Sequence, residues 1–309
     1  MAYSIALTGH GLIVFSGADA QSFLHSQLTC DVAALARDRS TYGAYCTPKG
    51  RMLATFLLWR SGEDFFMQLP SALGEPIQRQ LTKFILRSKV KAADVSNEWI
   101  AIGIAGEDAA AVVERCFGQA PHAAHEVVHA DGTTIIALPI GRFEVIAPGN
   151  KAPSLVESLA GQAQPAEPEY WDWLDIRAGI PTITAATREE LVPQMANLDL
   201  VGGVSFTKGC YPGQEIVARM HYRGTLKQRT YLANIAGEER PQPGDRLYSP
   251  ATGEQSCGMI VNAARSPEGG HDVLAVIQIA AAEGGDVRWK APGGPVLKLL
   301  SLPYAFETA

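Results

Sequence analysis

A reactive thiol is the chemistry suggested by one short segment of this sequence. The segment runs from Lys208 to Glu215 and reads Lys-Gly-Cys-Tyr-Pro-Gly-Gln-Glu. Its glycines permit backbone angles that a side chain would forbid, and Pro212 fixes its own φ. The residues from Gln214 to Met220 are predicted to form a short helix, so Cys210 would lie just before a helix N-terminus. Unpaired backbone N–H groups there and the ammonium of Lys208 would favour the thiolate, the form that attacks electrophiles or binds metal.

The alternative interpretation of this segment is structural. In that case its glycines only form a tight turn, and Cys210 is a small buried residue, as unpaired cysteines often are. The chemistry of the segment alone supports the two interpretations equally. In either case we expect Gln214 and Glu215 to brace the loop by hydrogen bonds to backbone N–H groups, as capping side chains do. The residues assigned to support of the loop are Gly209, Tyr211, Gly213, Gln214 and Glu215.

Length and composition predict a soluble globular protein with more than one domain. The chain has 309 residues, which exceeds the roughly 250–300 residues that one hydrophobic core usually serves. Hydrophobic residues make up 47% and charged residues 19%, so neither a disordered nor a fibrous class fits. The net charge of −6 argues against a sequence-independent nucleic-acid binder. No apolar run approaches the roughly 18 residues that a membrane span needs.

The cysteines indicate a reducing compartment. There are five, an odd number, they are widely spaced, and no pair has the C-x-x-C spacing of zinc or redox sites. We therefore expect a cytoplasmic protein without a resident metal. If Cys210 binds a metal ion, it acts singly, because Cys116 lies in a predicted helix and Cys257 in a predicted β region. Cys46, beside the turn at 47–50, is the one other cysteine that we expect near the site.

Alternating strand-like and helical patterns predict an α+β region followed by a β domain. The clearest amphipathic helix is predicted over 71–90, a linker over 161–168, and a helix over 170–178. After Arg223, short apolar runs are separated by Gly, Pro, Asp and Asn, which is typical of a small β-barrel or sandwich. The predicted domains are therefore 1–225, composed of two interleaved α+β domains, and 226–309.

The segment at 208–215 resembles the K-G-C-Y-x-G-Q-E signature of the YgfZ family. The resemblance covers nearly the whole chain, with further matches at 23–32, 49–52, 178–181, 193–206, 217–219 and 223–224. It implies a fold similar to the T-protein of the glycine cleavage system. That fold is a three-domain ring around a central hole that binds tetrahydrofolate, with a small C-terminal β-barrel.

The resemblance also implies a folate site. Family folate binding uses a tryptophan before A-G-x-P, and Trp171 occupies that place; an indole offers a large face to a flat pterin. Without the resemblance, Trp171 would simply bury a helix stripe. A second tryptophan of some relatives aligns with about His10, which by itself looks like an ordinary surface histidine. Relatives tend to read R-I-E where this chain has Asp-Ile-Arg at 175–177, so polar contacts from that turn would be reversed in sign.

Two functions follow from the resemblance. The first is a folate-binding accessory factor for synthesis or repair of iron–sulfur clusters in particular enzymes. Its partners are those client enzymes or assembly proteins, its effect on tRNA modification is indirect, and neither stable nucleic-acid binding nor a membrane is expected. The second is a folate-dependent aminomethyltransferase. The T-protein has an important carboxylate where this chain has Leu53 and Ala54, which cannot act as acid or base. The missing carboxylate and the motif residues Lys208 and Cys210 favour the first function.

Overall fold

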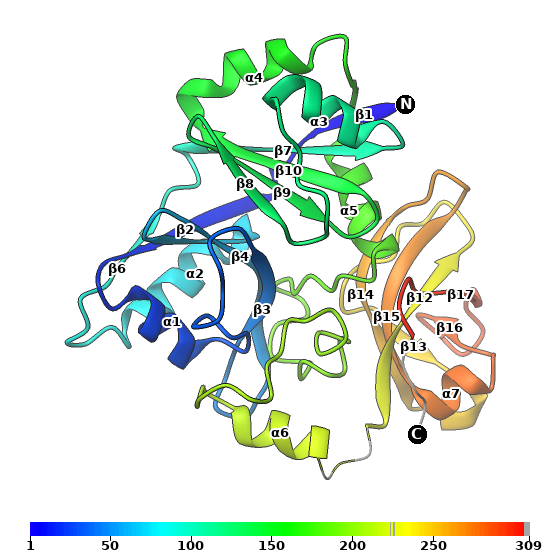
Figure 1. Ribbon diagram of the computed structural model, residues 1–309. Coiled ribbons are helices and arrows are strands. Elements are labelled where there is room, and N and C mark those ends of the chain that lie inside the picture. Colours follow the sequence, from blue (N-terminus) through cyan, green and yellow to red (C-terminus); the bar gives the residue numbers. More distant parts are fainter. Residues whose placement is uncertain (223, 225, 306–309) are drawn as a thin grey trace. The chain divides into compact units, whose positions relative to one another are not determined.

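The structure is a computed structural model that describes residues 1–222, 224 and 226–305, which form two compact units (Figure 1). The first unit comprises Met1–Gln27, Asp31–Tyr42 and Phe56–Trp171, and the second comprises Leu28–Cys30, Gly43–Thr55 and Asp172–Ala309. The chain therefore passes between the units several times. The domain boundary at residue 225 stays a prediction.

A six-stranded sheet with helices on one face makes up one part of the first unit. Its order is β11-β1-β7-β10-β9-β8, from β1 (Ala2–Ala6), β7 (Trp99–Gly106), β8 (Val127–Ala130), β9 (Thr133–Leu138), β10 (Arg142–Pro148) and β11 (Gln164–Ala166). The helices α3 (Ala109–Phe117) and α4 (Ala152–Leu159), with the short 3₁₀ turn η1 (Gly149–Lys151), cover one face (Figure 1). Ile104 and Val145 pack there against Val112 and Leu155. Because side chains alternate along a strand, Arg142, Glu144 and Ile146 point to the opposite face.

The predicted linker at 161–168 is wrong in part, because it contains β11. This short strand pairs in parallel with β1, with Ser4 opposite Pro165. Proline lacks a ladder N–H, yet an edge strand accepts it. Polar and proline-rich composition therefore marked the edge of a sheet rather than an unstructured connection.

The second sheet has the order β3-β4-β5-β2-β6. Its strands are β2 (His10–Ser16), β3 (Ser40–Cys46), β4 (Met52–Ser61), β5 (Asp64–Pro70) and β6 (Lys91–Asp94), and α1 (Ala20–Gln27) follows β2. The predicted turn between β3 and β4 is confirmed, since the Gly50 N–H donates to the Thr47 carbonyl over 2.9 Å. Its position in the second unit places it beside the Cys210 segment, as described below.

The predicted helix over 71–90 is too long. The helix α2 (Ser71–Thr82) buries Leu73, Ile77 and Leu81 against β2, β5 and β6. Beyond it the chain turns, and Leu86 adopts a φ of 46°, which ends helical propagation. Phe84, which the periodicity placed on the buried face, is 49% exposed. Among the residues that the structure describes, no helix is long and apolar enough to cross a membrane.

A half-buried histidine, His125, joins the segment before β8 to the first residue of β3. The Ser40 N–H donates to the His125 carbonyl over 2.8 Å, and Ser40 Oγ lies 3.1 Å from His125 Nδ1. The Tyr42 ring meets the imidazole edge-on at 4.7 Å. Burial, and then the charge of Arg39, lower the pKa of His125 to about 4. His125 therefore remains neutral in the folded protein at neutral pH.

This histidine should make the protein acid-sensitive. An unfolded chain binds the proton near the ordinary pKa of about 6.5, whereas the folded chain binds it only near 4. The contribution of His125 to the free energy of unfolding is therefore fully present above about pH 6.5. It falls by up to about 3 kcal/mol as the pH drops to 4. His125→Asn should flatten this slope, since asparagine tolerates the φ of 67°. Urea unfolding at several pH values from 7 to 4 measures how the free energy of unfolding changes with pH. Equal changes in the unmodified protein and in His125→Asn would contradict the low pKa of His125.

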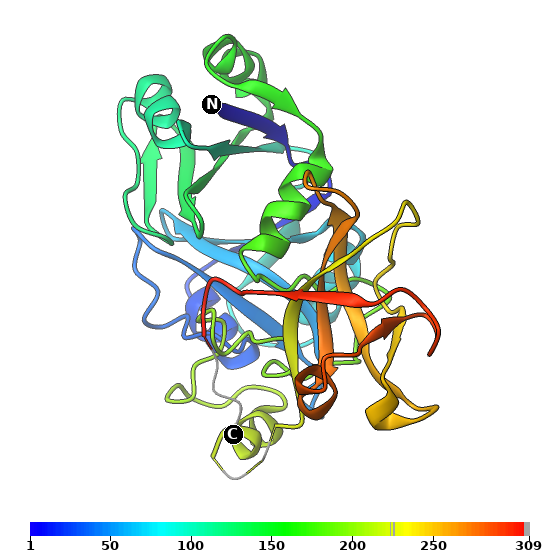
Figure 2. The same ribbon diagram turned by 90° about the vertical axis from the view of Figure 1, so that its right-hand side faces the viewer.

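An antiparallel sheet at the C-terminal end dominates the second unit. Its order is β16-β13-β14-β15-β12-β17, from β12 (Gln228–Ile235), β13 (Arg246–Tyr248), β14 (Ser256–Arg265), β15 (His271–Gln278), β16 (Arg288–Trp289) and β17 (Leu297–Leu300). A bridge from Arg288 to Val296 brings the two edge strands together, so the sheet curls around a core that includes Trp289 and Ile260 (Figure 2). The small elements η2 (Pro250–Thr252) and α7 (Ile279–Glu283) complete it. The prediction of a small β domain in this region is confirmed, and its sheet is curled and antiparallel.

An irregular stretch connects α5 (Pro168–Arg177) to α6 (Gln214–Tyr222). The buried Asn197 and the half-buried Asn262 tie this stretch to the C-terminal sheet. Asn197 Nδ2 donates to the Thr230 carbonyl over 2.8 Å, and Asn262 contacts both backbone polar groups of Thr182. The helix predicted over 214–220 is confirmed as α6. The stretch before it thus has fixed backbone positions without regular secondary structure.

Candidate functional site

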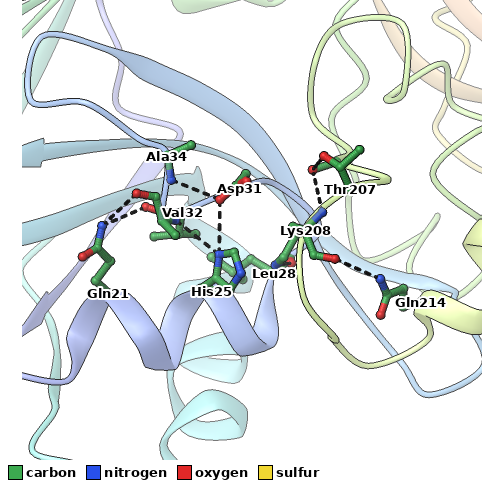
Figure 3. Close-up of polar contacts among 11 residues, drawn as sticks. Gln21, His25, Leu28, Asp31, Val32, Ala34, Thr207, Lys208 and Gln214 are labelled. Atoms are coloured by element: carbon green, nitrogen blue, oxygen red, sulfur yellow. Dashed lines mark hydrogen bonds and ion pairs between the residues drawn. The ribbon is translucent and has the colours of Figure 1, made fainter.

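The Cys210 segment is anchored at its first end by Lys208. The Lys208 ammonium is buried and donates to the Leu28 carbonyl over 2.6 Å (Figure 3). It also lies 5.0 Å from the centre of the Tyr211 ring. Its backbone N–H donates to Ser205 Oγ over 3.3 Å. A buried ammonium needs such partners, because desolvating a charge is costly. Lys208 therefore holds the loop to the segment at 28–30.

The second end of the segment packs against the turn between β3 and β4. Gly213 has a φ of 83°, and a Cβ built on it would lie 2.5 Å from the Thr47 carbonyl oxygen and 2.6 Å from Gly50 N. The Gln214 side chain donates to the Lys208 carbonyl over 3.5 Å (Figure 3). Gln214 thus bonds a backbone carbonyl of the loop and not the backbone N–H groups that we expected. The predicted backbone freedom of Gly213 is confirmed.

Between these two anchors, the thiol of Cys210 is exposed. Gly209 and Glu215 are exposed as well, and Glu215 stands in the first turn of α6, where a negative charge is favourable. Tyr211 instead points inward, where burial, and then the charges of Cys46 and Cys30, raise the pKa of its hydroxyl. The structural alternative, in which Cys210 is a buried filler, is therefore wrong.

The other cysteines are distributed as predicted. Cys116 is half-buried in α3, and Cys257 is buried in β14. Cys46 is buried beside the turn, and burial raises the pKa of its thiol to about 12. At neutral pH Cys46 is thus a neutral thiol, unsuited to binding iron. Of the five cysteines, Cys210 is the exposed one.

Gly213→Ala should disrupt this loop. An alanine at this φ costs about 1–2 kcal/mol, and the contacts with Thr47 and Gly50 are to backbone, which cannot move aside cheaply. Gly118→Ala is the matched control, since Gly118 has a φ of 75° in the left-handed helical region, with no atom within 4 Å of its Cβ position. Urea unfolding should show a clearly larger loss for Gly213→Ala. Equal losses would mean that close packing at Gly213 is unimportant.

A second candidate site is a cavity of about 380 Å³ in the first unit. Its walls are mostly apolar and include Leu12, Ile102, Ile146 and Trp99, whereas its polar side chains include His10, Gln68 and Ser96. This volume lies within the roughly 300–1,000 Å³ of small-molecule sites, and apolar walls with few polar groups are typical of them. His10 is half-buried at the start of β2 and lines this cavity.

A set of buried polar side chains extends from the cavity along one face of the six-stranded sheet of the first unit, the face opposite α3 and α4. Gln68 Nε2 donates to the Glu144 carboxylate, and both residues are buried. Arg142 lies two residues before Glu144 on β10, and its guanidinium sits 4.6 Å from the centre of the Trp171 ring. We call Gln68, Glu144 and Arg142 the polar wall. The polar wall thus runs from the cavity that His10 lines to the indole of Trp171.

Trp171 itself is only 2% exposed. Its ring fills the space above Gly103, where an added Cβ would come within 2.4 Å of it. Gly103 pairs with Glu144 across β7 and β10. The structure therefore places Trp171 in the packing behind the polar wall, and its direct contact with folate stays a prediction.

Gln68 and Trp99 line this cavity, although neither was predicted as a site residue. Gln68 was detectable in principle, because it is a polar residue within the otherwise apolar strand β5. Trp99 gave no such signal, since an aromatic residue at the start of a strand is ordinary. Only the approach of β2, β5 and β7 brings the two side chains to one cavity.

Two further positions bear on the choice of function. Leu53 and Ala54 are buried apolar residues of β4, so this part of the strand offers no acid or base. In the Asp-Ile-Arg segment at 175–177, Arg177 stands where relatives tend to have a glutamate. It lies 3.6 Å from the buried carboxylate of Asp272, which also accepts a hydrogen bond from Trp173 Nε1 over 2.8 Å. Arg177 is thus neutralised within the second unit.

Comparisons with known proteins agree with this geometry. Residues 6–200 match the GCVT N-terminal domain family. The chain is 32% identical to the tRNA-modifying protein YgfZ of Sodalis glossinidius over 304 residues, which is 97% of this chain and 92% of that protein. It is 33% identical to the protein of that name from Yersinia pseudotuberculosis over 305 residues, with the same coverage.

Among solved structures, the glycine cleavage system aminomethyltransferase T from Bartonella henselae matches with a TM-score of 0.80. The match covers 98% of this chain and 86% of that one at 19% identity, so it shows the fold alone. The predicted α+β fold of the T-protein type is confirmed. With the exposed thiol in its anchored loop and relatives over nearly its full length, the chain belongs to the YgfZ family.

Proposed function

We propose that this protein is a folate-binding accessory factor for the synthesis or repair of iron–sulfur clusters in particular enzymes. It acts in the cytoplasm on those client enzymes or on their assembly proteins. The curated relatives carry the name tRNA-modifying protein. We assign this chain an indirect effect on tRNA modification, through an iron–sulfur enzyme and without stable binding of nucleic acid or membrane.

The observation that carries the proposal is the exposed thiol of Cys210 on a loop anchored at both ends. Thiolates are the normal protein ligands of iron–sulfur clusters. A single cysteine cannot hold a cluster, so the cluster or its iron is a substrate that Cys210 contacts transiently. Thiol exchange with a partner's cysteine uses the same exposure. Lys208 keeps the loop in place through its bond to the Leu28 carbonyl.

The cavity of the first unit fits a reduced folate. It has the volume of a small-molecule site, and its apolar walls and Trp99 suit a flat ring. His10 and Gln68 supply hydrogen-bonding groups at its surface. When bound, tetrahydrofolate would act as a reductant or as a regulatory ligand. Trp171, which packs against Gly103 and the Arg142 guanidinium, would support this site from behind the polar wall.

The alternative function is a folate-dependent aminomethyltransferase, which the similarity of fold favours. The buried apolar pair Leu53 and Ala54 weighs against it, because transfer to folate needs a titratable group near the reacting nitrogen. An exposed motif thiol also has no part in that reaction.

Two assays separate these functions. In cells deprived of the native protein, expression of this chain should restore the activity of an affected iron–sulfur enzyme. With a lipoyl carrier protein and tetrahydrofolate, the purified protein should show no glycine-cleavage turnover. Robust turnover without restoration would overturn the accessory role in favour of the transferase.

A further inference from the structure

Gln68 is the residue that joins the cavity of the first unit to the polar wall. It lines the cavity, is 6% exposed, and donates its amide N–H to the Glu144 carboxylate. Its strand neighbours Met67 and Leu69 are buried apolar residues. A polar side chain at such a position is costly unless its hydrogen-bonding groups are used.

The carboxylate of Glu144 determines which way the Gln68 amide points. A carboxylate oxygen that accepts from Gln68 must face its NH₂ group, because a carbonyl oxygen cannot donate. The Gln68 carbonyl oxygen is then the group of this amide that can serve a ligand in the cavity. Such an oxygen selects ligands that present an N–H group.

We propose that Gln68, oriented by Glu144, accepts a hydrogen bond from the pterin ring and so determines the specificity of the cavity. This inference rests on the proposed folate function. The pterin is the part of a folate that carries several ring and amino N–H donors, whereas its p-aminobenzoylglutamate part offers mainly acceptors and negative charge. The cavity therefore takes the pterin end, and Glu144 is a positioning residue for that recognition.

The test measures binding by calorimetry with three probes: 5-formyltetrahydrofolate, 6-methyltetrahydropterin and p-aminobenzoylglutamate. Gln68→Met keeps the side-chain volume but removes the acceptor, and it should weaken binding of both pterin probes by about tenfold. Glu144→Gln removes the fixed orientation of the amide and should weaken both by a smaller factor. Gln78→Met is the matched control, since Gln78 lies outside the cavity and donates to the Ala92 carbonyl; its affinities should equal those of the unmodified protein.

The outcomes distinguish this inference from the proposed function. Binding of the pterin probes by the unmodified protein, with equal affinity in Gln68→Met and Glu144→Gln, overturns the role of Gln68 and leaves the folate function intact. The role of Gln68 is likewise overturned if p-aminobenzoylglutamate alone binds as tightly as the full folate. Failure of the unmodified protein to bind any pterin probe overturns the folate function and this inference together. A thermal melt of each variant confirms folding, and Glu144→Gln provides the test if Gln68→Met does not fold.

Discussion

Replacing Cys210 with serine is expected to abolish the ability of this protein to restore an iron–sulfur enzyme in cells that lack the native protein. A serine hydroxyl has nearly the same size, but it does not ionise near neutral pH and is a poor ligand for iron. Because Cys210 is exposed, the free energy of unfolding should change by no more than about 0.5 kcal/mol. The loss of function would then reflect chemistry and not folding.

Lys208→Ala tests the same loop through its anchor. This change removes the bond to the Leu28 carbonyl and the contact with the Tyr211 ring, so it should destabilise the protein by about 1–3 kcal/mol. It should also reduce restoration of the client enzyme. Cys116→Ala is the matched control, a cysteine substitution in α3 outside the loop, and it should restore fully. Full restoration by both the Cys210 and the Lys208 variants would refute a functional role of the loop.

Trp171→Ala should both destabilise the protein and reduce the folate-dependent quenching of tryptophan fluorescence, while the share contributed by Trp99 in the cavity wall should remain. Removing a fully buried aromatic side chain costs about 3–5 kcal/mol. Here the cost includes the contacts of the indole with Gly103 and with the Arg142 guanidinium. Denaturant unfolding measures the first effect, and titration with tetrahydrofolate measures the second.

Trp171→Phe separates ligand contact from packing, because phenylalanine keeps much of the volume but does not absorb at tryptophan wavelengths. Trp99→Phe is the matched control for the cavity, which Trp99 lines. Quenching that persists unchanged in Trp171→Phe and disappears in Trp99→Phe would remove Trp171 from the folate site. The stability loss of Trp171→Ala would remain, as expected of a residue that supports the polar wall from behind.

Local signals in the sequence were sufficient where the structure depends on neighbouring residues. The turn at 47–50, the helix α6 and the positive φ of Gly213 all follow from glycine, proline and periodic apolar residues within a few positions. The helix predicted over 71–90 ends at Thr82 instead, because the chain turns at Leu86 although the apolar period continues. Periodicity reports which residues could share a face, and tertiary packing decides where the face ends.

The family, the fold type and the candidate thiol Cys210 could all be inferred from short motifs and local patterns. What those residues contact became known only from the folded chain. It directs the Lys208 ammonium to the Leu28 carbonyl, 180 positions away, and it joins Gln68 to Glu144, 76 positions away. Such pairings depend on how the strands align and on which side chains share a buried face. Neither can be predicted from the spacing of residues in the sequence.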